Sequence, residues 1–314
     1  MTFRILSIDG GGIRGLIPAI LLERMDQHRG DWLEQCDLIT GTSTGGILAL
    51  GLAAGLAPSE LRALYEENGP RIFDDSWLDD LLDLGKLVGA DYSNRWLRGA
   101  LKRIFGQKRL GDLRPSVLIP TFDLDNEAAR PADRRWKPKL FHNMKGPGND
   151  RSVLAYKVAL YTSAAPTYFP SEDGYIDGGV YANNPSMCAL AQSLDSRYCR
   201  SPPSLEDIRL VSLGTGSSPQ FIRKKRVDWG YAQWASPLLS VMYDGVSGIA
   251  DYQCRQILGD RYFRLAPVFP EGTVIPLDGV DRIADLVSFA ESVRCTDPAN
   301  RRHTNVAEWL KEIW

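Results

Sequence analysis

Gly41-Thr42-Ser43-Thr44-Gly45 places a serine between two glycines, where a short apolar run (residues 37–40) meets a helix-like run (residues 46–57). This arrangement is typical of a nucleophile elbow, a sharp strand-to-helix turn that presents a serine hydroxyl. Small neighbours such as Gly41 and Gly45 tolerate the strained backbone, and the helix N-terminus favours developing negative charge. Because the bare G-x-S-x-G pattern also occurs by chance, its interpretation depends on the rest of the chain.

A run of glycines follows the first predicted strand. Residues 4–8 indicate a buried strand, which leads directly into Asp9-Gly10-Gly11-Gly12-Ile13-Arg14-Gly15 and then into a helix. Backbone N–H groups just before a helix have no partner within it, so such a loop can bind an anion. In acyl transfer that anion is the oxyanion of the tetrahedral intermediate. We therefore expect Gly10, Gly11 and Gly12 to form an oxyanion hole, with Arg14 as a supporting charge.

The same glycines also match a nucleotide-binding pattern. Gly10-x-Gly12-x-x-Gly15 has the spacing of a dinucleotide fingerprint, but that fingerprint needs an acidic residue at the end of the second strand. Here the second strand ends in Thr40-Gly41-Thr42 instead. A P-loop is excluded because no Gly-Lys-Ser/Thr follows the glycines. The oxyanion interpretation is therefore favoured.

A serine nucleophile needs a general base. The chain has three histidines, His28, His142 and His303. None lies in a catalytic motif, and each is interpreted as a surface or capping histidine. The stronger candidate is Asp177, which ends a short apolar run and is followed by Gly178 and Gly179. These glycines allow a sharp turn that exposes the carboxylate, although Asp before Gly is also common in ordinary turns.

Together these residues resemble the patatin-like phospholipase family. The resemblance rests on Asp9-Gly-Gly-Gly-Ile-Arg-Gly15 as the oxyanion loop, Gly41-Thr-Ser-Thr-Gly45 as the nucleophile motif and Asp177-Gly-Gly179 as the second half of a Ser-Asp dyad. Residues 159–170 also look like the family's helix leading into the Asp strand, and residues 213–216 resemble a later core-strand end. The resemblance covers roughly residues 3–270 and leaves the C-terminal helices (residues 279–314) less diagnostic.

The resemblance implies a lipid acyl hydrolase that works without histidine. Ser43 would attack a fatty-acyl ester of a membrane phospholipid, Asp177 would take its proton, and water would release the acyl group. An ordinary Asp pKa near 3.9 is badly matched to this task. The site must therefore raise it by partial burial, or remove the proton only as the oxyanion forms. The headgroup, the acyl position, the chain length and the oligomeric state are left open.

Other functions fit the sequence less well. An α/β-hydrolase is disfavoured because Ser43 follows the second strand, with too little chain before it for that fold. An acyl-carrier-protein transacylase is a closer alternative, but that group usually pairs its serine with histidine. A non-catalytic lipid-binding module is disfavoured because oxyanion loop, serine and aspartate are all present. Some patatin-like proteins act in bacterial antiphage defence as phospholipases activated by cyclic nucleotides, so such an activator is a further hypothesis.

The alternation of segments predicts an α/β fold, a three-layer α/β/α sandwich with a mainly parallel central sheet, in one domain spanning residues 1–314. Glycine loops at one edge of that sheet should gather Gly10 to Gly12, Ser43 and Asp177. The predicted strands are residues 4–8, 37–40, 117–123, 139–141, 175–176, 208–213 and 262–265.

Composition agrees with a globular enzyme. Charged residues make up 24% and hydrophobic ones 44%, and a net charge of −2 gives no support to nucleic-acid binding. Five cysteines without a C-x-x-C pair indicate reduced thiols rather than a metal site or a disulfide framework. The first strand begins almost at once, which leaves no room for a signal peptide. We expect a cytoplasmic protein, peripheral at membranes, without metal or cofactor.

Two further segments are rich in apolar and aromatic residues. Residues 77–88 are amphipathic, and residues 229–252 interleave Trp, Tyr, Leu and Val with few charges. Each is either a lid or membrane-contacting surface, or a helix that packs on the sheet; the packing interpretation is favoured. The cationic run Arg223-Lys224-Lys225-Arg226 is either solvated or a contact for anionic headgroups or an anionic regulator.

Overall fold

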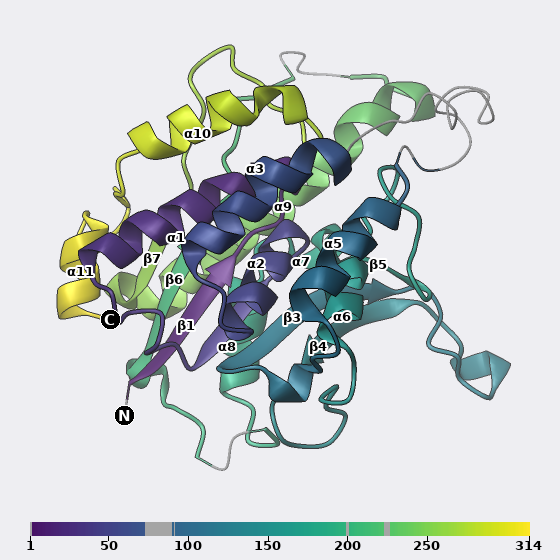
Figure 1. Cartoon of the computed structure of the whole chain (residues 1–314), viewed down its shortest axis with the longest axis horizontal. Helices are drawn as coiled ribbons and strands as arrows, with labels where there is room; N and C mark the ends of the chain where they lie inside the picture. The colour runs from purple at the N-terminus through teal and green to yellow at the C-terminus, as the bar shows by residue number, and fades with distance from the viewer. Residues whose placement is uncertain (1, 73–89, 91, 199–200, 223–226) are drawn as a thin grey trace.

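A mainly parallel sheet runs through the centre of the molecule (Figure 1). The computed structural model describes residues 2–72, 90, 92–198, 201–222 and 227–314. Within these residues the sheet has seven strands in the order β4-β3-β2-β1-β6-β7, with β5 paired to β3. All seven predicted strands are present. Their bounds are β1 Phe3–Ile8, β2 Leu38–Gly41, β3 Ser116–Asp123, β4 Lys137–His142, β5 Tyr175–Asp177, β6 Ile208–Leu213 and β7 Tyr262–Leu265.

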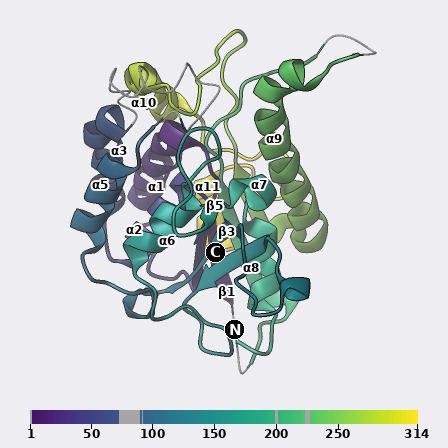
Figure 2. The ribbon, with the colours of Figure 1, turned by 90° about the vertical axis from the view of Figure 1, so that its right-hand side faces the viewer.

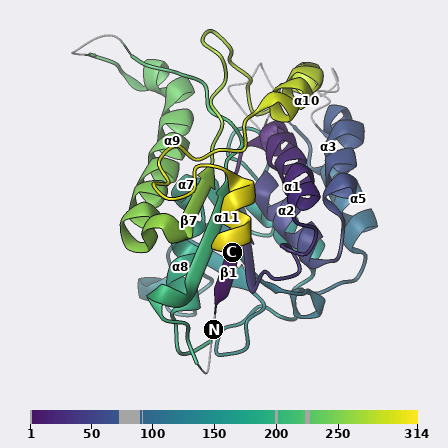
Figure 3. The same cartoon turned by 90° about the vertical axis from the view of Figure 1, so that its left-hand side faces the viewer.

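Helices cover both faces of the sheet, which confirms the predicted three-layer α/β/α architecture. One face carries α1 (Leu16–His28), α2 (Thr44–Ala53), α3 (Pro58–Ile72), α5 (Arg95–Phe105), α6 (Ala155–Thr162) and α10 (Ile283–Ser292). The other face carries α7 (Gly179–Ala182), α8 (Ser186–Ser193) and α9 (Tyr231–Leu258). Figures 2 and 3 show the sheet edge-on between these two layers, with α11 (Val306–Glu312) beside the strands.

Strand β1 shows why the sheet is sandwiched. Successive side chains of a strand point to opposite faces, and both faces of β1 are apolar. Leu6 and Ile8 join the larger core cluster with α1 and α2, whereas Ile5 joins the smaller cluster with α8 and the end of α9. A parallel strand that is apolar on both faces must be covered on both sides, as observed.

The position of β5 follows from how β3 uses its two edges. Strand β4 pairs with β3 from Leu118 to Asp123 and so occupies one edge. On the other edge β2 pairs only with Ser116, Val117 and Leu118, and β5 then pairs antiparallel with residues 121–123. Strand β5 thus pairs with the part of this edge that lies beyond the end of β2, where the chain turns into the elbow. Asp177, the last residue of β5, therefore lies next to the end of β2.

Two segments differ from the sequence-based expectations. The helix expected over residues 159–170 ends at Thr162, since α6 spans Ala155–Thr162 and the following residues form turns. Within residues 229–252, α9 is only partly a packing helix. Its C-terminal half buries Ala250, Cys254 and Leu258 against the sheet, but its outer face exposes a set of large apolar side chains: Leu238, Val241, Met242, Ile249 and Tyr252.

Residues 77–88 and the cationic run at residues 223–226 lie outside the described residues. Of the helices that the structure does describe, each is too short or too polar to cross a bilayer.

Candidate active site

Ser43 lies at a strained turn between β2 and α2. Its backbone φ is 56°, in the left-handed region that a residue other than glycine adopts rarely and at an energetic cost. The flanking glycines permit the turn because the chain passes extremely close to itself. A Cβ on Gly41 would collide with the backbone of Gly45, and a Cβ on Gly45 would collide with the carbonyl oxygen of Ile8. This is the geometry expected of a nucleophile elbow.

Thr162 fixes the backbone of the elbow. Its Oγ1 accepts a hydrogen bond from the Ser43 N–H at 2.9 Å and donates to the carbonyl oxygen of Pro120 at 2.6 Å. The hydroxyl is fully buried, so both hydrogen bonds are shielded from water. Thr162 thereby ties the elbow to β3, the strand that also carries β5. The Ser43 N–H is consequently already satisfied.

Asp177 is a buried carboxylic acid beside Ser43. The Gly179 N–H donates to its Oδ1 at 2.7 Å. Burial raises the pKa of Asp177 to about 7, against the smaller lowering effects of the Ser43 hydroxyl and of the Gly179 N–H. Gly178 packs so tightly on β3 that a Cβ would overlap the Pro120 carbonyl. The carboxylate is therefore held rigidly, and near neutral pH it is divided between its charged and neutral forms.

The glycine loop (residues 9–15) lies directly against Ser43. A Cβ on Gly10 would come within 3.2 Å of the Ser43 Cβ. The Gly10 N–H, however, donates to the carbonyl oxygen of Asn183 at 3.0 Å. The N–H groups of Gly11 and Gly12 have no acceptor among the described residues. Two free donors thus remain beside the serine, and the expectation that Gly10 is a third one needs correction.

Contacts with β7 and with the segments after β6 and β7 hold the glycine loop in place. Asp9 forms a buried, two-pronged ion pair with Arg264 of β7, with N–O distances of 2.6 and 3.2 Å. Thr215 donates from Oγ1 to the Gly10 carbonyl at 2.8 Å. Gly12 has φ of +57° and sits against the carbonyl of Leu277, where a Cβ would collide. The conformation that points the Gly11 and Gly12 N–H groups outward is therefore imposed by the core.

An apolar cavity opens from this site. Ser43, Asp177, Gly11 and Gly12 lie along its wall, and the rest of the lining is mostly aliphatic or aromatic. Its volume is about 70 Å³. The main apolar lining residues are Ile47, Leu64, Ile72, Leu97, Leu101 and Phe169. The lining of this cavity suits an alkyl chain better than a polar substrate.

The Tyr65 hydroxyl, on the α3 side of this cavity, already has hydrogen-bond partners. It pairs with the hydroxyl of Thr44 and donates to the Thr44 carbonyl at 3.0 Å. Burial raises the pKa of Tyr65 well above its ordinary value, so it stays neutral. This wall therefore offers little to a polar ligand.

A second, more polar cavity adjoins the first. It is lined by Asp9, Arg14, Thr215, Asp244, Ser247 and Arg264, among others, and has a volume of about 370 Å³. Arg14 lines this polar cavity and not the apolar one. The side chain expected to support the oxyanion hole therefore faces a neighbouring compartment.

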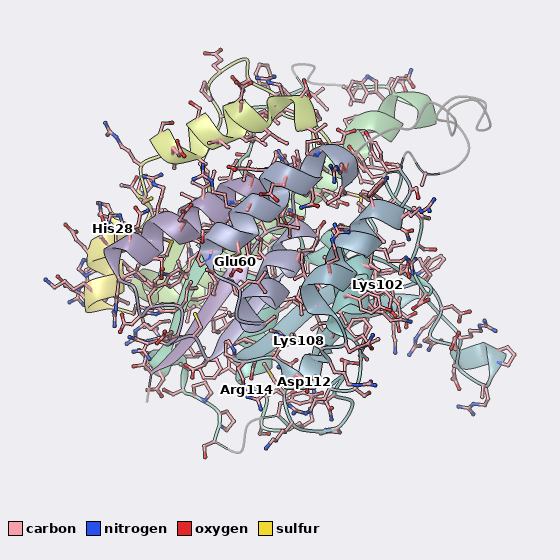
Figure 4. All side chains as sticks on the ribbon, in the orientation of Figure 1. His28, Glu60, Lys102, Lys108, Asp112 and Arg114 are labelled. Atoms are coloured by element: carbon pink, nitrogen blue, oxygen red, sulfur yellow. The ribbon has the colours of Figure 1, made fainter. Side chains whose placement is uncertain are left out.

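The three histidines lie elsewhere, although His142 and His303 are buried and not at the surface as expected. His28 ends α1, near α11 (Figure 4), and His142 packs edge-on against the ring of Tyr198 with centroids 4.7 Å apart. His303 Nε2 lies 3.4 Å from a carboxylate oxygen of Glu312. None lines either cavity. Reasoning from sequence assigned no role to Thr162 or to Tyr243, which lines both cavities. Both lie in segments singled out above (residues 159–170 and 229–252), but only the tertiary structure brings their side chains to the site.

The family assignment rests on comparison with known proteins. The family model described as "Patatin-like phospholipase" matches residues 6–190, which include the glycine loop, the elbow and Asp177. The chain belongs to the patatin-like phospholipase family. This membership supports a lipid hydrolase.

Two curated relatives cover most of the chain. Patatin-like protein 1 of Oryza sativa subsp. indica is 30% identical over 340 residues, covering 91% of this chain and 80% of the relative. A cGAMP-activated phospholipase of Pseudomonas aeruginosa is 32% identical over 272 residues, covering 84% of this chain and 78% of the relative. Among solved structures, VipD from Legionella pneumophila is a distant neighbour, with a TM-score of 0.38 and 11% identity over 91% of this chain and 67% of VipD.

Proposed function

We propose that this protein is a phospholipase A-type hydrolase that cleaves fatty-acyl esters of membrane phospholipids. Ser43 is the nucleophile, Asp177 the general base, and the Gly11 and Gly12 N–H groups form the oxyanion hole. The observation that carries the proposal is that Ser43, at a strained strand-to-helix turn, and the buried Asp177, whose pKa is raised to about 7, lie together at the wall of an apolar cavity. A base with this pKa is matched to neutral pH.

The chemistry follows from these positions. Asp177 accepts the Ser43 proton as Oγ bonds to the ester carbonyl carbon, and the resulting oxyanion takes hydrogen bonds from Gly11 and Gly12. When the intermediate collapses, the ester C–O bond breaks and Asp177 returns the proton to the leaving alcohol. Asp177 then takes a proton from water, whose oxygen attacks the acyl-enzyme carbonyl carbon. As the bond from that carbon to Ser43 Oγ breaks, Asp177 returns the proton to Oγ and the fatty acid is released. The strained φ of Ser43 keeps its hydroxyl exposed to the substrate throughout.

The test is release of free fatty acid from phospholipid vesicles. Ser43→Ala and Asp177→Asn should each reduce the rate by several orders of magnitude, because each removes one half of the proton transfer. The matched control replaces all three histidines with glutamine, which should leave the rate within a few-fold of wild type. Loss of activity in a folded single-histidine variant would contradict the dyad. Acyl transfer to a carrier protein without free fatty acid would favour the transacylase alternative.

A cyclic-nucleotide activator is a second candidate feature. The supporting observation is the relative from Pseudomonas aeruginosa, named a cGAMP-activated phospholipase, which is 32% identical over 84% of this chain. Hydrolysis that requires an added cyclic dinucleotide would support activation. Full hydrolysis without any nucleotide, unchanged by cGAMP, would contradict it.

A further inference from the structure

The apolar and polar cavities are separated by a thin wall. Asn183, just after α7, and Tyr243, in α9, line both of them. Helices α7 and α9 lie side by side (Figure 2), so these two residues sit where the compartments meet. A ligand whose acyl chain fills the apolar cavity and whose ester lies at Ser43 can extend its polar part past this wall. The polar cavity is therefore placed to receive a headgroup.

Two hydrogen-bond donors at the polar cavity have no protein partner. The Arg14 Nε is shielded from solvent and unpaired, and no hydrogen bond from its guanidinium group is made to any described residue. The buried Tyr243 hydroxyl is likewise unpaired. A buried donor without an acceptor costs free energy, so such groups point to an acceptor that binds there.

The charged groups of this cavity fall into two sets. Asp9, Arg264 and Asp251 are engaged in ion pairs with one another or with Arg255. Arg14 and the exposed Asp244 form no ion pair within 4 Å in the part of the chain that the structure describes. Burial lowers the pKa of Arg14, and the negative charge of Asp244 is the largest influence that opposes this fall. The two groups are therefore close enough to interact. One cation inside the cavity and one anion at its rim are thus left without partners.

We propose that the polar cavity binds a phosphate that carries a neighbouring N–H donor, as in the headgroup of a phospholipid with a primary ammonium group, such as phosphatidylethanolamine. The phosphate accepts hydrogen bonds from Arg14 and Tyr243, and the ammonium group donates to Asp244 at the rim. This inference rests on the proposed function, because it assumes that an ester lies at Ser43. A purine nucleotide also combines phosphate with N–H donors, and the experiment separates these two sources.

The experiment is competition within a single vesicle population that contains equal amounts of phosphatidylethanolamine and phosphatidylglycerol. Both lipids meet the same bound enzyme, so the ratio of their lyso-products reports headgroup selection and not vesicle binding. Wild type should favour the ethanolamine lipid. Asp244→Asn should lower that ratio roughly tenfold, the value of one charge-assisted hydrogen bond. No preference in wild type, or an unchanged ratio in Asp244→Asn, would overturn the assignment.

Two further variants test the structural basis. Glu308→Gln also removes one exposed carboxylate, on α11 and outside both cavities, and should leave the ratio unchanged. Tyr243→Phe removes only an unpaired hydroxyl. It should raise KM for both phospholipids several-fold while affecting a neutral ester such as p-nitrophenyl octanoate less. An equal effect of Tyr243→Phe on all three substrates would mean that the hydroxyl is not a phosphate ligand.

Added cGAMP tests whether the phosphate in the polar cavity belongs to a nucleotide and not to a lipid headgroup. If a headgroup fills the cavity, added cGAMP should not alter the product ratio. A change caused by cGAMP in wild type and abolished by Asp244→Asn would assign the cavity to the nucleotide and overturn the headgroup assignment. Failure of the proposed function is distinct, because it would abolish release from both lipids and from the neutral ester.

Discussion

The burial of Asp177 predicts that activity and stability change with pH in opposite directions. A carboxylate whose pKa is raised in the folded state contributes stability at low pH, when it is protonated, and loses that contribution as the pH rises through the folded pKa. For Asp177 this window runs from about 3.8 to about 7. At 1.36 kcal/mol for each tenfold change in proton affinity, the free energy of unfolding loses roughly 4 kcal/mol across the window. The same ionisation creates the catalytic base, so activity should rise as stability falls.

Asp177→Asn isolates this effect because it keeps the side chain's shape and removes its titration. The variant also alters the hydrogen bonds from Gly179 and Ser43, but that offset is nearly independent of pH. The quantity to measure is therefore the free energy of unfolding of the variant minus that of wild type. Between pH 5 and pH 9 we expect this difference to rise by roughly 3 kcal/mol, because wild type loses that much stability over the part of the window that lies above pH 5.

Urea unfolding of both proteins at several pH values gives the stability difference directly. The kcat/KM of wild type, measured on a neutral ester over the same range, should rise about tenfold per pH unit and level off near pH 7. A stability difference that stays constant from pH 5 to pH 9 would refute the reasoning. So would a kcat/KM profile with its midpoint below pH 5, because either result would mean that Asp177 is not buried as a neutral acid.

Two other substitutions test the frame around the site. Thr162→Val leaves the buried Ser43 N–H without an acceptor, so it should lower the free energy of unfolding in urea by about 1–3 kcal/mol and lower kcat more than it raises KM. Thr162→Ser keeps the hydroxyl and should retain most of the stability and most of kcat. Equal behaviour of the two variants would contradict this role. Arg264→Met leaves Asp9 buried and unpaired, and should destabilise the protein by roughly 3–5 kcal/mol at pH 8 but less at pH 4, where Asp9 can take a proton. A loss independent of pH would mean that packing, and not the ion pair, is responsible.

Much of the fold was predictable because its signals are local. Most of the strands contain a short apolar run, and the glycine loop and the elbow each occur at a strand end that precedes a helix. The sheet then brings these ends together, since parallel strands direct their carboxyl ends to one edge. The lengths of the helices were less predictable: α6 stops at Thr162 although the apolar pattern continues, because residues 163–170 turn towards β5.

The details of the site depended on contacts between distant residues. The Gly10 N–H is taken by the carbonyl of Asn183, which no pattern around Gly10 reveals. Arg14 lies in a glycine-rich motif, yet its side chain lines the polar cavity, which Asp244 of α9 also lines. Sequence reasoning identified which residue types meet at the site; the direction of each donor required the tertiary structure.

The pKa of Asp177 links substrate binding to base strength. The main influence that raises it is burial, and the apolar cavity that meets the carboxylate is lined by side chains such as Leu97, Leu101 and Phe169. An acyl chain that enters this cavity displaces water and makes the surroundings of Asp177 drier still, which increases its affinity for the Ser43 proton. In the proposed mechanism the same lining therefore serves two purposes: it holds the acyl chain, and it makes a carboxylate basic enough to replace histidine.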